Sequence, residues 1–459
     1  MKIDHWILQK YNVPVPRYTS YPTADQFRAG MTEKSFIQLV GASNQHEPKY
    51  LSFYVHIPFC AKICHYCGCN ALRLQNPERV IAYKNALLKE IEQVTSLIDP
   101  DRKIAQIHFG GGTPNAVEVG FIREIVDALR KRFSVVDEPE FAIECHPGLL
   151  DFPYIDQLLD IGFNRFSLGI QDFNTEVLKT VNRMPSKIPL EELITYFRKR
   201  NPKVSVNLDF MYGLPGQTVE SFGETIRQAV RIAPDRLVTF SYAHVPWLKK
   251  HQQVLERVGL PSTDEKTEMF LTSREILIES GLIPIGLDHY VQPGDELHMA
   301  LQEGQLHRNF QGYCTRKTTG QVYAFGVSAI SQLQFAYLQN VKEVDRYIGL
   351  LEQGLFPVEK GLTISHDEWL VKEIITNLMC SGRLNLRQFA TEHGLTVEEF
   401  IALTDVSFDE LTAFVQDGLI EFSDLNLTVT ALGSLFIRNV AAVFDPAYRP
   451  QTNRFSTSI

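Results

Sequence analysis

Alternation between apolar runs and helical stretches constrains the fold of this chain more than any other feature. Runs rich in apolar and β-branched residues occur at 51–57, 104–109, 140–144, 164–170, 204–211 and 236–242. Stretches with helical spacing lie among them or follow them, at 77–98, 119–133, 220–232 and 263–280. Buried strands that alternate with helices indicate a parallel sheet with helices outside it. These six units are fewer than a closed barrel requires, so the pattern predicts an α/β fold with an open, partial (β/α)6 TIM-like barrel.

Both ends of the chain depart from this pattern. Residues 14–23 hold three prolines and two tyrosines, which favour an extended arm that lies on a surface. After residue 357 the sequence turns helical, and it then contains two short apolar runs that resemble the hairpin of a winged-helix module. We therefore expect three regions: an N-terminal arm over 1–34, a main catalytic domain over 35–357 and a mostly helical, winged-helix-like C-terminal cap domain over 358–459.

The composition is that of an ordinary soluble globular protein, with 44% hydrophobic residues and a net charge of −9. The acidic balance argues against a sequence-blind nucleic-acid binder, and it means that any anionic ligand must be met by locally placed cations or backbone N–H groups. We see no run long enough for a signal-peptide core or a membrane span. Seven unevenly spaced cysteines are poor material for disulfides, so a reducing cytoplasm is the expected location.

Four of the cysteines fall within ten residues, directly after the first apolar run. Cys60, Cys64 and Cys67 have the spacing Cys-x3-Cys-x2-Cys, which places three thiolates on one short loop. Three thiolates fit three corners of a cubic iron–sulfur cluster and leave one iron open to a small molecule. A zinc site is the alternative, but zinc wants four ligands, usually in two separated pairs, and no second pair is present. Cys69 follows Cys67 too closely to bind the same cube without strain, so we expect it to support the site.

A second group of candidates lies at or near the ends of later apolar runs. The glycine triplet 110–112 lets backbone groups approach a ligand, although a tight strand exit would also explain it. Glu144, Gln171 and Asp209 end later runs, and Arg183 lies shortly beyond Gln171. Because the carboxyl ends of parallel strands share one rim, these side chains form a candidate ligand lining. Glu144 and Asp209 are suited to grip ribose hydroxyls, and Arg183 is suited to pair a carboxylate.

These motifs carry a family resemblance. The cysteine spacing, with the aromatic Tyr66 before the third cysteine and Gly-Gly-Gly-Thr-Pro at 110–114, is similar to the radical S-adenosylmethionine (SAM) superfamily. More narrowly, the chain resembles the family of oxygen-independent coproporphyrinogen III oxidases of bacterial haem biosynthesis. The segments that carry this resemblance run from the arm to the late main domain, at 17–23, 54–60, 67–69, 171–174, 212–215, 307–313 and 326–331.

The resemblance implies a barrel of the radical SAM type that holds two kinds of cofactor. Cys60, Cys64 and Cys67 would hold a 4Fe–4S cluster, and the amino and carboxylate groups of one SAM would complete the open iron. The positions that match the lining of this first SAM are Tyr54, Gly111, Glu144 and Ile330. A second SAM molecule would lie beside Tyr66, Gly112, Thr113, Gln171, Arg183, Asp209 and Ala243.

The resemblance also implies a reaction. A 5′-deoxyadenosyl radical derived from SAM would remove hydrogen from the β-carbon of a propionate, carbon dioxide would leave, and a vinyl group would remain. Two such events would convert coproporphyrinogen III to protoporphyrinogen IX. Because this hydrogen removal is beyond any acid–base side chain, we assign no catalytic residue. The candidates for meeting the substrate carboxylates are Arg17, His307, Arg308, Gln311 and Arg316. A one-electron donor such as flavodoxin or ferredoxin is the implied partner, and the family suggests a monomer.

Two departures from the family pattern lie beside the expected SAM positions. Tyr66 stands where the family usually has Phe, and Cys145 and His146 follow Glu144 where the family commonly has Val and Asp. Cys145 and His146 can alter cofactor handling if they face the cavity, and they are filler if they point away from it.

Two other functional interpretations stay open at this point. One is a related radical SAM protein that carries haem as a chaperone or opens the haem ring as a methyltransferase; Cys69 and the 17–23 arm argue against the chaperone. The other is an iron–sulfur sensor that binds DNA through the winged-helix-like tail. The acidic balance and the lack of a basic helix in that tail disfavour the sensor.

Overall fold

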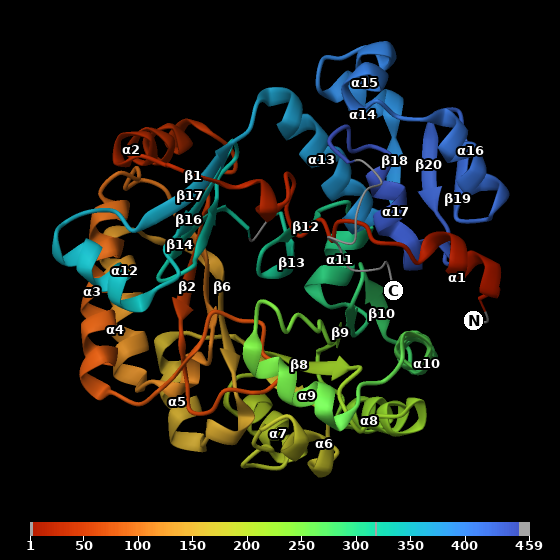
Figure 1. Cartoon of the computed structure of the whole chain (residues 1–459). Helices are drawn as coiled ribbons and strands as arrows, with labels where there is room; N and C mark the ends of the chain where they lie inside the picture. Colours follow the sequence, from red (N-terminus) through yellow and green to blue (C-terminus); the bar gives the residue numbers. More distant parts are fainter. Residues whose placement is uncertain (1–2, 317–318, 449–459) are drawn as a thin grey trace.

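The computed structural model describes residues 3–316 and 319–448. One large sheet forms its centre, and the six predicted strands lie side by side in chain order, all parallel (Figure 1). These strands are β2 (Leu51–Ile57), β5 (Ile104–Gly111), β6 (Val135–Cys145), β7 (Arg165–Gln171), β8 (Ser205–Tyr212) and β9 (Arg236–Ser241). Because the strand order within the described residues has two ends, the predicted open, partial barrel is confirmed.

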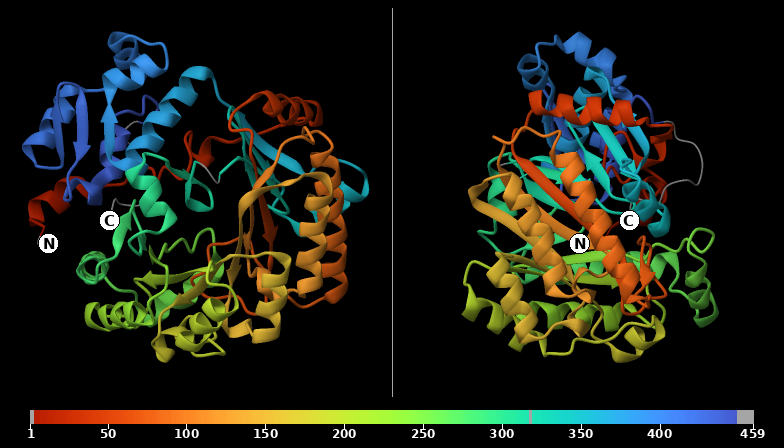
Figure 2. Two further views of the ribbon diagram at one scale, coloured as in Figure 1. Left: turned by 180° about the vertical axis from the view of Figure 1, so that it is seen from behind. Right: turned by 90° about the vertical axis from the view of Figure 1, so that its left-hand side faces the viewer.

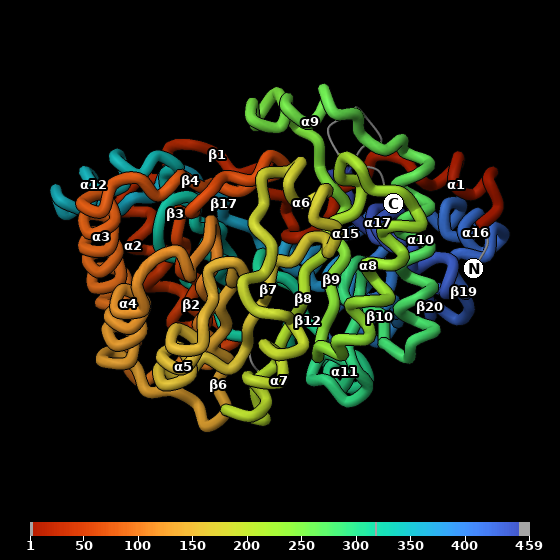
Figure 3. The backbone as a smooth tube through the Cα atoms, turned by 90° about the horizontal axis from the view of Figure 1, so that it is seen from below, coloured from red at the N-terminus to blue at the C-terminus, as the bar shows by residue number. Residues whose placement is uncertain are grey.

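Helices cover the outer face of the parallel strands (Figure 2), and Figure 3 shows them following one another around the sheet. They are α3 (Pro77–Thr95), α4 (Val119–Arg132), α5 (Phe152–Ile161), α7 (Leu190–Arg200), α8 (Val219–Ile232) and α10 (Thr263–Glu279). In α8, Phe222 and Ile226 lie one turn apart and are fully buried. Burial of side chains of this size contributes about 1.5–3 kcal/mol each, so the apolar stripe decides which helix face packs on the sheet.

The sheet extends beyond the six predicted strands at both edges. Beside β2 lies β14 (Gln321–Phe325), parallel to it, followed by the antiparallel strands β15 (Ile330–Gln332), β16 (Ala336–Asn340), β17 (Val358–Thr363) and β1 (Arg28–Ala29). Beside β9 lie β11 (His289–Val291) and β10 (Ile283–Ile285), also antiparallel. The sheet thus has thirteen strands within the described residues, and β1 ties the N-terminal arm to its edge.

A smaller, mostly helical unit follows the sheet, as expected of a winged-helix-like module (Figure 1). It contains α13 (His366–Ser381), α14 (Leu386–Glu392), α15 (Val397–Thr404), α16 (Phe408–Gln416), α17 (Ile437–Ala442) and the small sheet of β18 (Arg383–Asn385), β20 (Asn426–Val429) and β19 (Ile420–Ser423). The first helix of the chain, α1 (His5–Tyr11), lies against this unit, where the ring of Tyr11 is 5.4 Å from that of Phe414. The Tyr18 and Tyr21 hydroxyls then donate to Asp445 at 3.0 and 3.1 Å.

The arm therefore runs from the C-terminal unit to the edge of the main sheet. The division into domains at 34/35 and 357/358 stays a prediction. The remaining elements lie in connections: α2 (Glu33–Ala42), α6 (Thr175–Thr180), α9 (Gln253–Val258), α11 (Glu296–Gln302), α12 (Val344–Glu352), β3 (Phe59–Cys60), β4 (Leu72–Arg73), β12 (Leu306–Asn309) and β13 (Gly312–Thr315). Every helix in the described part of the chain is too short or too polar to cross a membrane.

Candidate active site

The cysteine loop begins directly after β2. The short strands β3 and β4 pair in parallel and close the neck of a loop over residues 60–73. Two backbone bonds fasten this neck, since Leu72 N–H donates to Pro58 at 2.7 Å and Leu74 N–H donates to Cys60 at 2.8 Å. The side chains of Cys60, Cys64 and Cys67 all line one cavity of about 560 Å³.

The three thiols have different surroundings. Thr113 Oγ1 donates to Cys60 Sγ at 3.2 Å, and Arg183 Nη1 donates to Cys64 Sγ at 3.6 Å. Burial raises the pKa of the Cys60 thiol to about 11. A hydrogen bond with the Cys69 thiol lowers the pKa of Cys67 to about 6, so Cys69 lies directly beside Cys67. Among the described residues, no three His, Cys, Asp or Glu side chains are arranged to hold a single metal ion. A cubic cluster binds its thiolates through different irons and needs no such convergence.

A segment after β9 contacts the backbone of the cysteine loop. Lys249 Nζ donates to the carbonyl of Cys69 at 2.7 Å, and His251 Nε2 donates to that of Cys67 at 2.8 Å. Gln252 Nε2 donates to the carbonyl of Tyr66 at 3.0 Å. These three bonds fix the backbone of the loop. No local motif marks the three residues, so the sequence interpretation missed them.

Glycines allow the end of β5 to approach the cysteine loop. Gly111 has φ +119°, and a Cβ atom there would lie 2.7 Å from Cε1 of His56. A Cβ atom on Gly112 would lie 2.9 Å from the backbone of Pro58 and 3.0 Å from Cys60 Sγ. Contacts this short disfavour any larger residue, so close packing against His56 and Pro58 explains Gly111 and Gly112.

Glu144, at the carboxyl end of β6, is anchored but accessible. His108 Nε2 donates to its Oε1 at 3.1 Å, and Gly111 N–H donates to its Oε2 at 3.3 Å. The side chain is still 44% exposed, and it lines the cavity. Its carboxylate thus retains lone pairs for a ligand hydroxyl or ammonium group.

A second polar cluster lies at the ends of β7 and β8. Asp209 accepts from Ser167 Oγ and from Asn207 Nδ2, both at 2.7 Å. Burial raises the pKa of Asp209 to about 7, because these neutral donors do not fully replace the lost water. Gln171 has φ +70°, a conformation that costs energy in residues other than glycine and that often marks a functional site.

Arg183 joins this cluster to the cysteine loop. Its Nη1 donates to the Tyr66 hydroxyl at 2.9 Å as well as to Cys64, and its Nη2 donates to the carbonyl of Gly169. The guanidinium therefore touches the loop and the end of β7 at once, which holds a positive charge next to the thiols.

The cavity brings most of the predicted residues together. Besides the three cysteines, its lining includes Tyr66, Gly111, Gly112, Thr113, Glu144, Gln171, Arg183, Asp209, Arg17, Arg308 and Gln311. Tyr54, Ala243 and Ile330 do not contribute to this lining. The Tyr54 hydroxyl donates to His56 Nδ1 at 3.2 Å, the Ala243 carbonyl accepts from Gln252 at 3.3 Å, and Ile330 begins β15.

The structure separates the predicted substrate residues into two groups. His307 and Arg316 line a different cavity of about 280 Å³, where Arg316 pairs with Glu373 at 2.9 Å. Burial lowers the pKa of His307 to about 3. Neighbouring residues of a strand point to opposite faces, so Arg308 reaches the cysteine cavity whereas His307 does not.

Arg17 and Arg308 come from the arm and from β12 and meet in the cysteine cavity. Arg308 Nη1 donates to the carbonyl of Arg17 at 3.4 Å, and Arg17 Nη2 lies 3.5 Å from Asp288 Oδ2. Although burial alone would raise the pKa of Asp288, the hydrogen bond from His289 and the two guanidinium charges hold it at about 2. At this part of the cavity, the two guanidinium groups thus lie beside one firmly ionised carboxylate.

Cys145 and His146 both contribute to the cavity lining. His146 N–H donates to Asn115 Oδ1 at 2.8 Å, and Gly148 N–H donates to His146 Nδ1 at 3.0 Å. Burial, helped by the charge of Arg183, lowers the pKa of His146 to about 3, so the ring is neutral at physiological pH. The residues that follow Glu144 are therefore part of the site.

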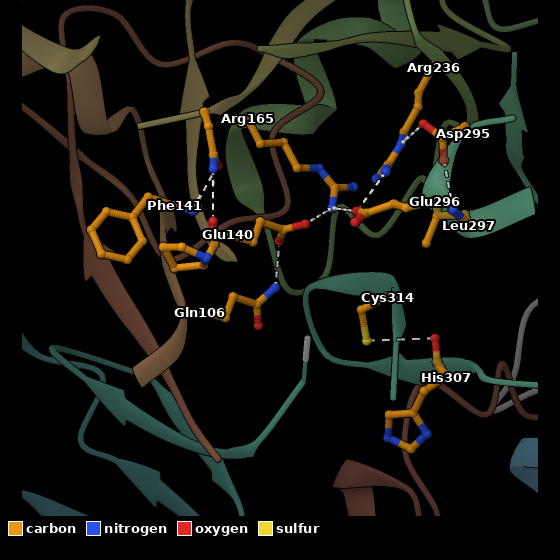
Figure 4. A network of polar contacts seen from close by, with 12 residues as sticks. Gln106, Glu140, Phe141, Arg165, Arg236, Asp295, Glu296, Leu297, His307 and Cys314 are labelled. Atoms are coloured by element: carbon orange, nitrogen blue, oxygen red, sulfur yellow. Dashed lines mark hydrogen bonds and ion pairs between the residues drawn. The ribbon is translucent and has the colours of Figure 1, made fainter. Parts of the chain in front are cut away.

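A second network lies toward the amino ends of the same strands (Figure 4). Arg165 at the start of β7, which also lines the cavity, lies 2.7 Å from Glu140 and 3.9 Å from Glu296. Arg236 at the start of β9 is 1% exposed and pairs with Asp295 and Glu296, each at 2.8 Å. The sequence interpretation missed this network, because each member is a single charge in an otherwise ordinary strand or helix start.

Comparison with known proteins agrees with the geometry. The model of the family described as "Radical SAM superfamily" matches residues 54–229, and that of the "HemN C-terminal domain" matches residues 364–436. The protein named "Oxygen-independent coproporphyrinogen III oxidase" of a Synechocystis strain is 38% identical over 96% of this chain and 94% of its own length. The protein of the same name from Escherichia coli K12 is 37% identical over 97% of this chain and 96% of its own length.

A solved structure extends the agreement to three dimensions. It is titled "Coproporphyrinogen III oxidase (HemN) from Escherichia coli is a Radical SAM enzyme", and it matches with a TM-score of 0.88 at 36% identity, covering 98% of this chain and 100% of that chain. Such identity over nearly the full length, with the cysteine loop, the glycine exit and the C-terminal unit in place, shows that the chain belongs to the family of oxygen-independent coproporphyrinogen III oxidases within the radical SAM superfamily.

Proposed function

We propose that this chain catalyses the oxygen-independent oxidative decarboxylation of two propionate side chains of coproporphyrinogen III to vinyl groups, giving protoporphyrinogen IX. One observation carries the proposal: a single cavity holds the three thiols, a rim of carboxylate and backbone groups, and the guanidinium groups of Arg17 and Arg308. The thiols and rim suit a cluster with SAM, and the cations suit a substrate that carries propionates.

The residues present fit a 4Fe–4S cluster. Cys60, Cys64 and Cys67 supply three thiolates, while Cys69 is engaged with Cys67. Gly112 leaves space beside Cys60, since a Cβ atom there would lie 3.0 Å from its sulfur. When bound, the cluster and SAM supply the radical chemistry that removes hydrogen from an unactivated carbon, which no side chain can do.

The rim residues fit two SAM molecules. We assign Glu144 and the backbone of Gly111 to the first, next to the cysteine loop, because the carboxylate is anchored yet keeps free lone pairs. We assign Asp209, Gln171 and Arg183 to the second. The Asp209 carboxylate lacks a paired cation, so ligand hydroxyls that donate to it would lower its pKa and gain binding energy.

The arm and β12 orient the substrate. Arg17 and Arg308 face the cavity of a chain whose net charge is −9, so they supply the local positive charge that propionates need. Paired guanidinium–carboxylate contacts fix geometry as well as charge, which would hold one β-carbon toward the SAM positions. For each vinyl group formed, one hydrogen atom and one carbon dioxide leave the substrate, and one electron passes to an external acceptor.

The same residues help to exclude water. The arm that carries Arg17 is fastened to the C-terminal unit through Tyr18 and Tyr21, which both donate to Asp445. An arm held in this way covers the cavity while the substrate reacts, which protects a radical from side reactions.

A one-electron donor such as flavodoxin or ferredoxin, a monomeric state and a cytoplasmic location complete the proposal. The seven free cysteines support a reducing compartment.

The test is a product assay under anaerobic conditions. The protein is reconstituted with iron and sulfide and supplied with SAM, a reductant and coproporphyrinogen III; mass spectrometry should then show loss of two carboxyl groups per substrate. If SAM is cleaved while the substrate stays unchanged, the chain acts instead as a related haem chaperone or haem-ring-opening methyltransferase. If an iron-loaded chain retains a specific DNA duplex at moderate salt, the sensor interpretation replaces both.

A further inference from the structure

Two exposed apolar side chains lie on the segment that supports the cysteine loop. Trp247 is 73% exposed and Leu248 is 72% exposed, and no other large apolar side chain in the described residues is as exposed. Single exposed apolar residues are common on protein surfaces. Here two of them are adjacent, and one is a tryptophan, a residue type enriched at binding hot spots. The reaction proposed above assigns no task to this pair.

The pair directly precedes residues that contact the backbone of the cysteine loop. The next residues, Lys249, His251 and Gln252, donate to the carbonyl groups of Cys69, Cys67 and Tyr66 at 2.7, 2.8 and 3.0 Å. The segment that carries the exposed pair therefore packs directly on the backbone of the cysteine loop. Figure 3 shows this segment and α9 projecting from the body of the protein, beside α6. We call the exposed surface of residues 244–258 the α9 surface.

The α9 surface is positive in an acidic protein. Residues 244–258 contain Lys249, Lys250 and Arg257 but only one carboxylate, Glu256. Glu256 lies 2.9 Å from His244 Nε2, which offsets part of its charge. The whole chain carries a net charge of −9, so the local charge here is opposite in sign to that of the molecule as a whole. On neighbouring α6, Glu176 and Lys179 lie 4.0 Å apart and offset one another.

We propose that the α9 surface docks a small acidic one-electron carrier protein and delivers its electron to a cluster held by the cysteine loop. This inference rests on the proposed function, which needs one electron for each SAM that is cleaved. In the step itself the carrier loses one electron and the cluster gains one, and no bond or proton is exchanged. An apolar centre of two side chains with a cationic rim suits the small, short-lived interfaces typical of electron-transfer pairs. The rim attracts the acidic partner, and Trp247 supplies the central contact.

Binding is measured first, because it does not depend on turnover. Oxidised flavodoxin and a 2Fe–2S ferredoxin are titrated into the full-length protein, with and without its cluster, over a series of salt concentrations. At least one carrier should bind, and rising salt should weaken the binding because exposed charges are screened. The double variant Trp247→Ser, Leu248→Ser should lose roughly tenfold or more in affinity. Lys250→Glu should lower the affinity for the carrier roughly threefold to tenfold at low salt, and the affinity of this variant should depend less on salt.

Turnover then separates docking from damage. Formation of 5′-deoxyadenosine by the holoenzyme should fall in parallel with affinity when reduced carrier is limiting. With dithionite, a small reductant that needs no docking surface, the double variant should match the wild type in rate and in cluster absorbance. Trp6→Ser is the matched control, because Trp6 is 49% exposed on α1, beside the C-terminal unit. It should change neither carrier binding nor either rate.

Several outcomes overturn the proposal. The docking role is ruled out if neither carrier binds the wild type. It is also ruled out if the double variant keeps wild-type affinity for the carrier. If the double variant forms 5′-deoxyadenosine more slowly by the same factor with carrier and with dithionite, Trp247 and Leu248 only stabilise the cysteine loop. The wild type can also be tested for binding to vesicles of mixed anionic and zwitterionic phospholipid. If the double variant loses this binding while carrier binding is unchanged, the surface belongs to a membrane contact instead. If carrier binding depends on Trp247 while coproporphyrinogen III stays unchanged with either reductant, docking survives and the proposed function fails.

Discussion

Among strands β6 to β9, charged residues lie toward the carboxyl ends and toward the amino ends of the sheet, and the two groups are built differently. At the carboxyl ends, Asp209 faces an open cavity with neutral hydrogen-bond donors, and burial raises its pKa to about 7. At the amino ends, Glu140 is buried between cations. Although burial alone would raise its pKa, Arg165 and Arg236 hold it at about 2.

The difference shows what each end does. Charges at the amino ends are matched within the protein, as Figure 4 shows for Arg236 between Asp295 and Glu296. Charges at the carboxyl ends are matched only in part, which leaves binding capacity for ligands. In barrels of parallel strands, the carboxyl end is where chemistry takes place and the amino end serves stability. Changes at the two ends should therefore have separable effects.

The largest effect is expected at the carboxyl end. Cys64→Ser should abolish the visible absorbance of the reconstituted cluster and all product formation, because one of the three proposed protein ligands is lost. Thermal unfolding of the protein before reconstitution should change little. Cys69→Ser is the control and should keep much of the absorbance. Equal loss of absorbance in both variants would contradict a site with three thiolate ligands.

The next largest effect is expected at the amino end. Arg236→Met leaves Asp295 and Glu296 without their buried partner, which should cost about 3–5 kcal/mol of unfolding free energy. Urea denaturation measures this loss, and product formation per folded molecule at low temperature should stay near the wild-type value. The control is Arg200→Met, which removes a half-exposed pair with Asp156 and should cost less than about 1 kcal/mol. Loss of activity without loss of stability in Arg236→Met would show that the two ends are coupled.

Local patterns in the sequence were sufficient for some parts of the molecule. The six parallel strands are visible because strands buried on both faces are nearly continuous apolar runs. The cysteine loop could be recognised in the sequence because its three proposed cluster ligands lie within one short loop and so form a local spacing pattern. The edge strands β14 to β17 are short and less uniform, and β14 pairs with β2 although some 270 residues separate them along the chain, from 51 to 321. No short-range pattern specifies such a pairing.

The site was predictable to the extent that it is local. Arg308 and His307 were both candidates for meeting substrate carboxylates, yet alternation along β12 directs them into different cavities. Lys249, His251 and Gln252 reach the cysteine loop across about 180 residues, from 69 to 249, and only the fold reveals that contact. The amino-end network is invisible for the same reason, since its charges come from different strands and α11.

A smaller effect tests the amino end through pH. Glu140 has a folded pKa of about 2, below its ordinary value of 4.5, so its contribution to stability is present above pH 4.5 and is lost as pH falls through 2. Glu140→Gln should therefore lower the unfolding free energy by about 2–3 kcal/mol at neutral pH, and by less at about pH 3. Urea denaturation at the two pH values measures the difference. A cost that does not depend on pH would mean that shape, rather than charge, is what Glu140 contributes.

The smallest effect, with the opposite sign, is expected for Asp209→Asn. The folded pKa of Asp209 is about 7, above its ordinary value of 3.8, so its contribution to stability is present below pH 3.8 and is lost as pH rises through 7. Without SAM, the Asn variant should unfold with a free energy about 1–2 kcal/mol higher than wild type at about pH 8 and similar at about pH 4. The amide oxygen of Asn207 has no hydrogen-bond partner among the described residues and can accept from the new side chain. Added SAM should remove this advantage, because the ribose hydroxyls that we propose for this site would donate to the wild-type carboxylate. An Asn variant that is less stable than wild type at both pH values would show that Asp209 belongs with the matched charges of the amino end.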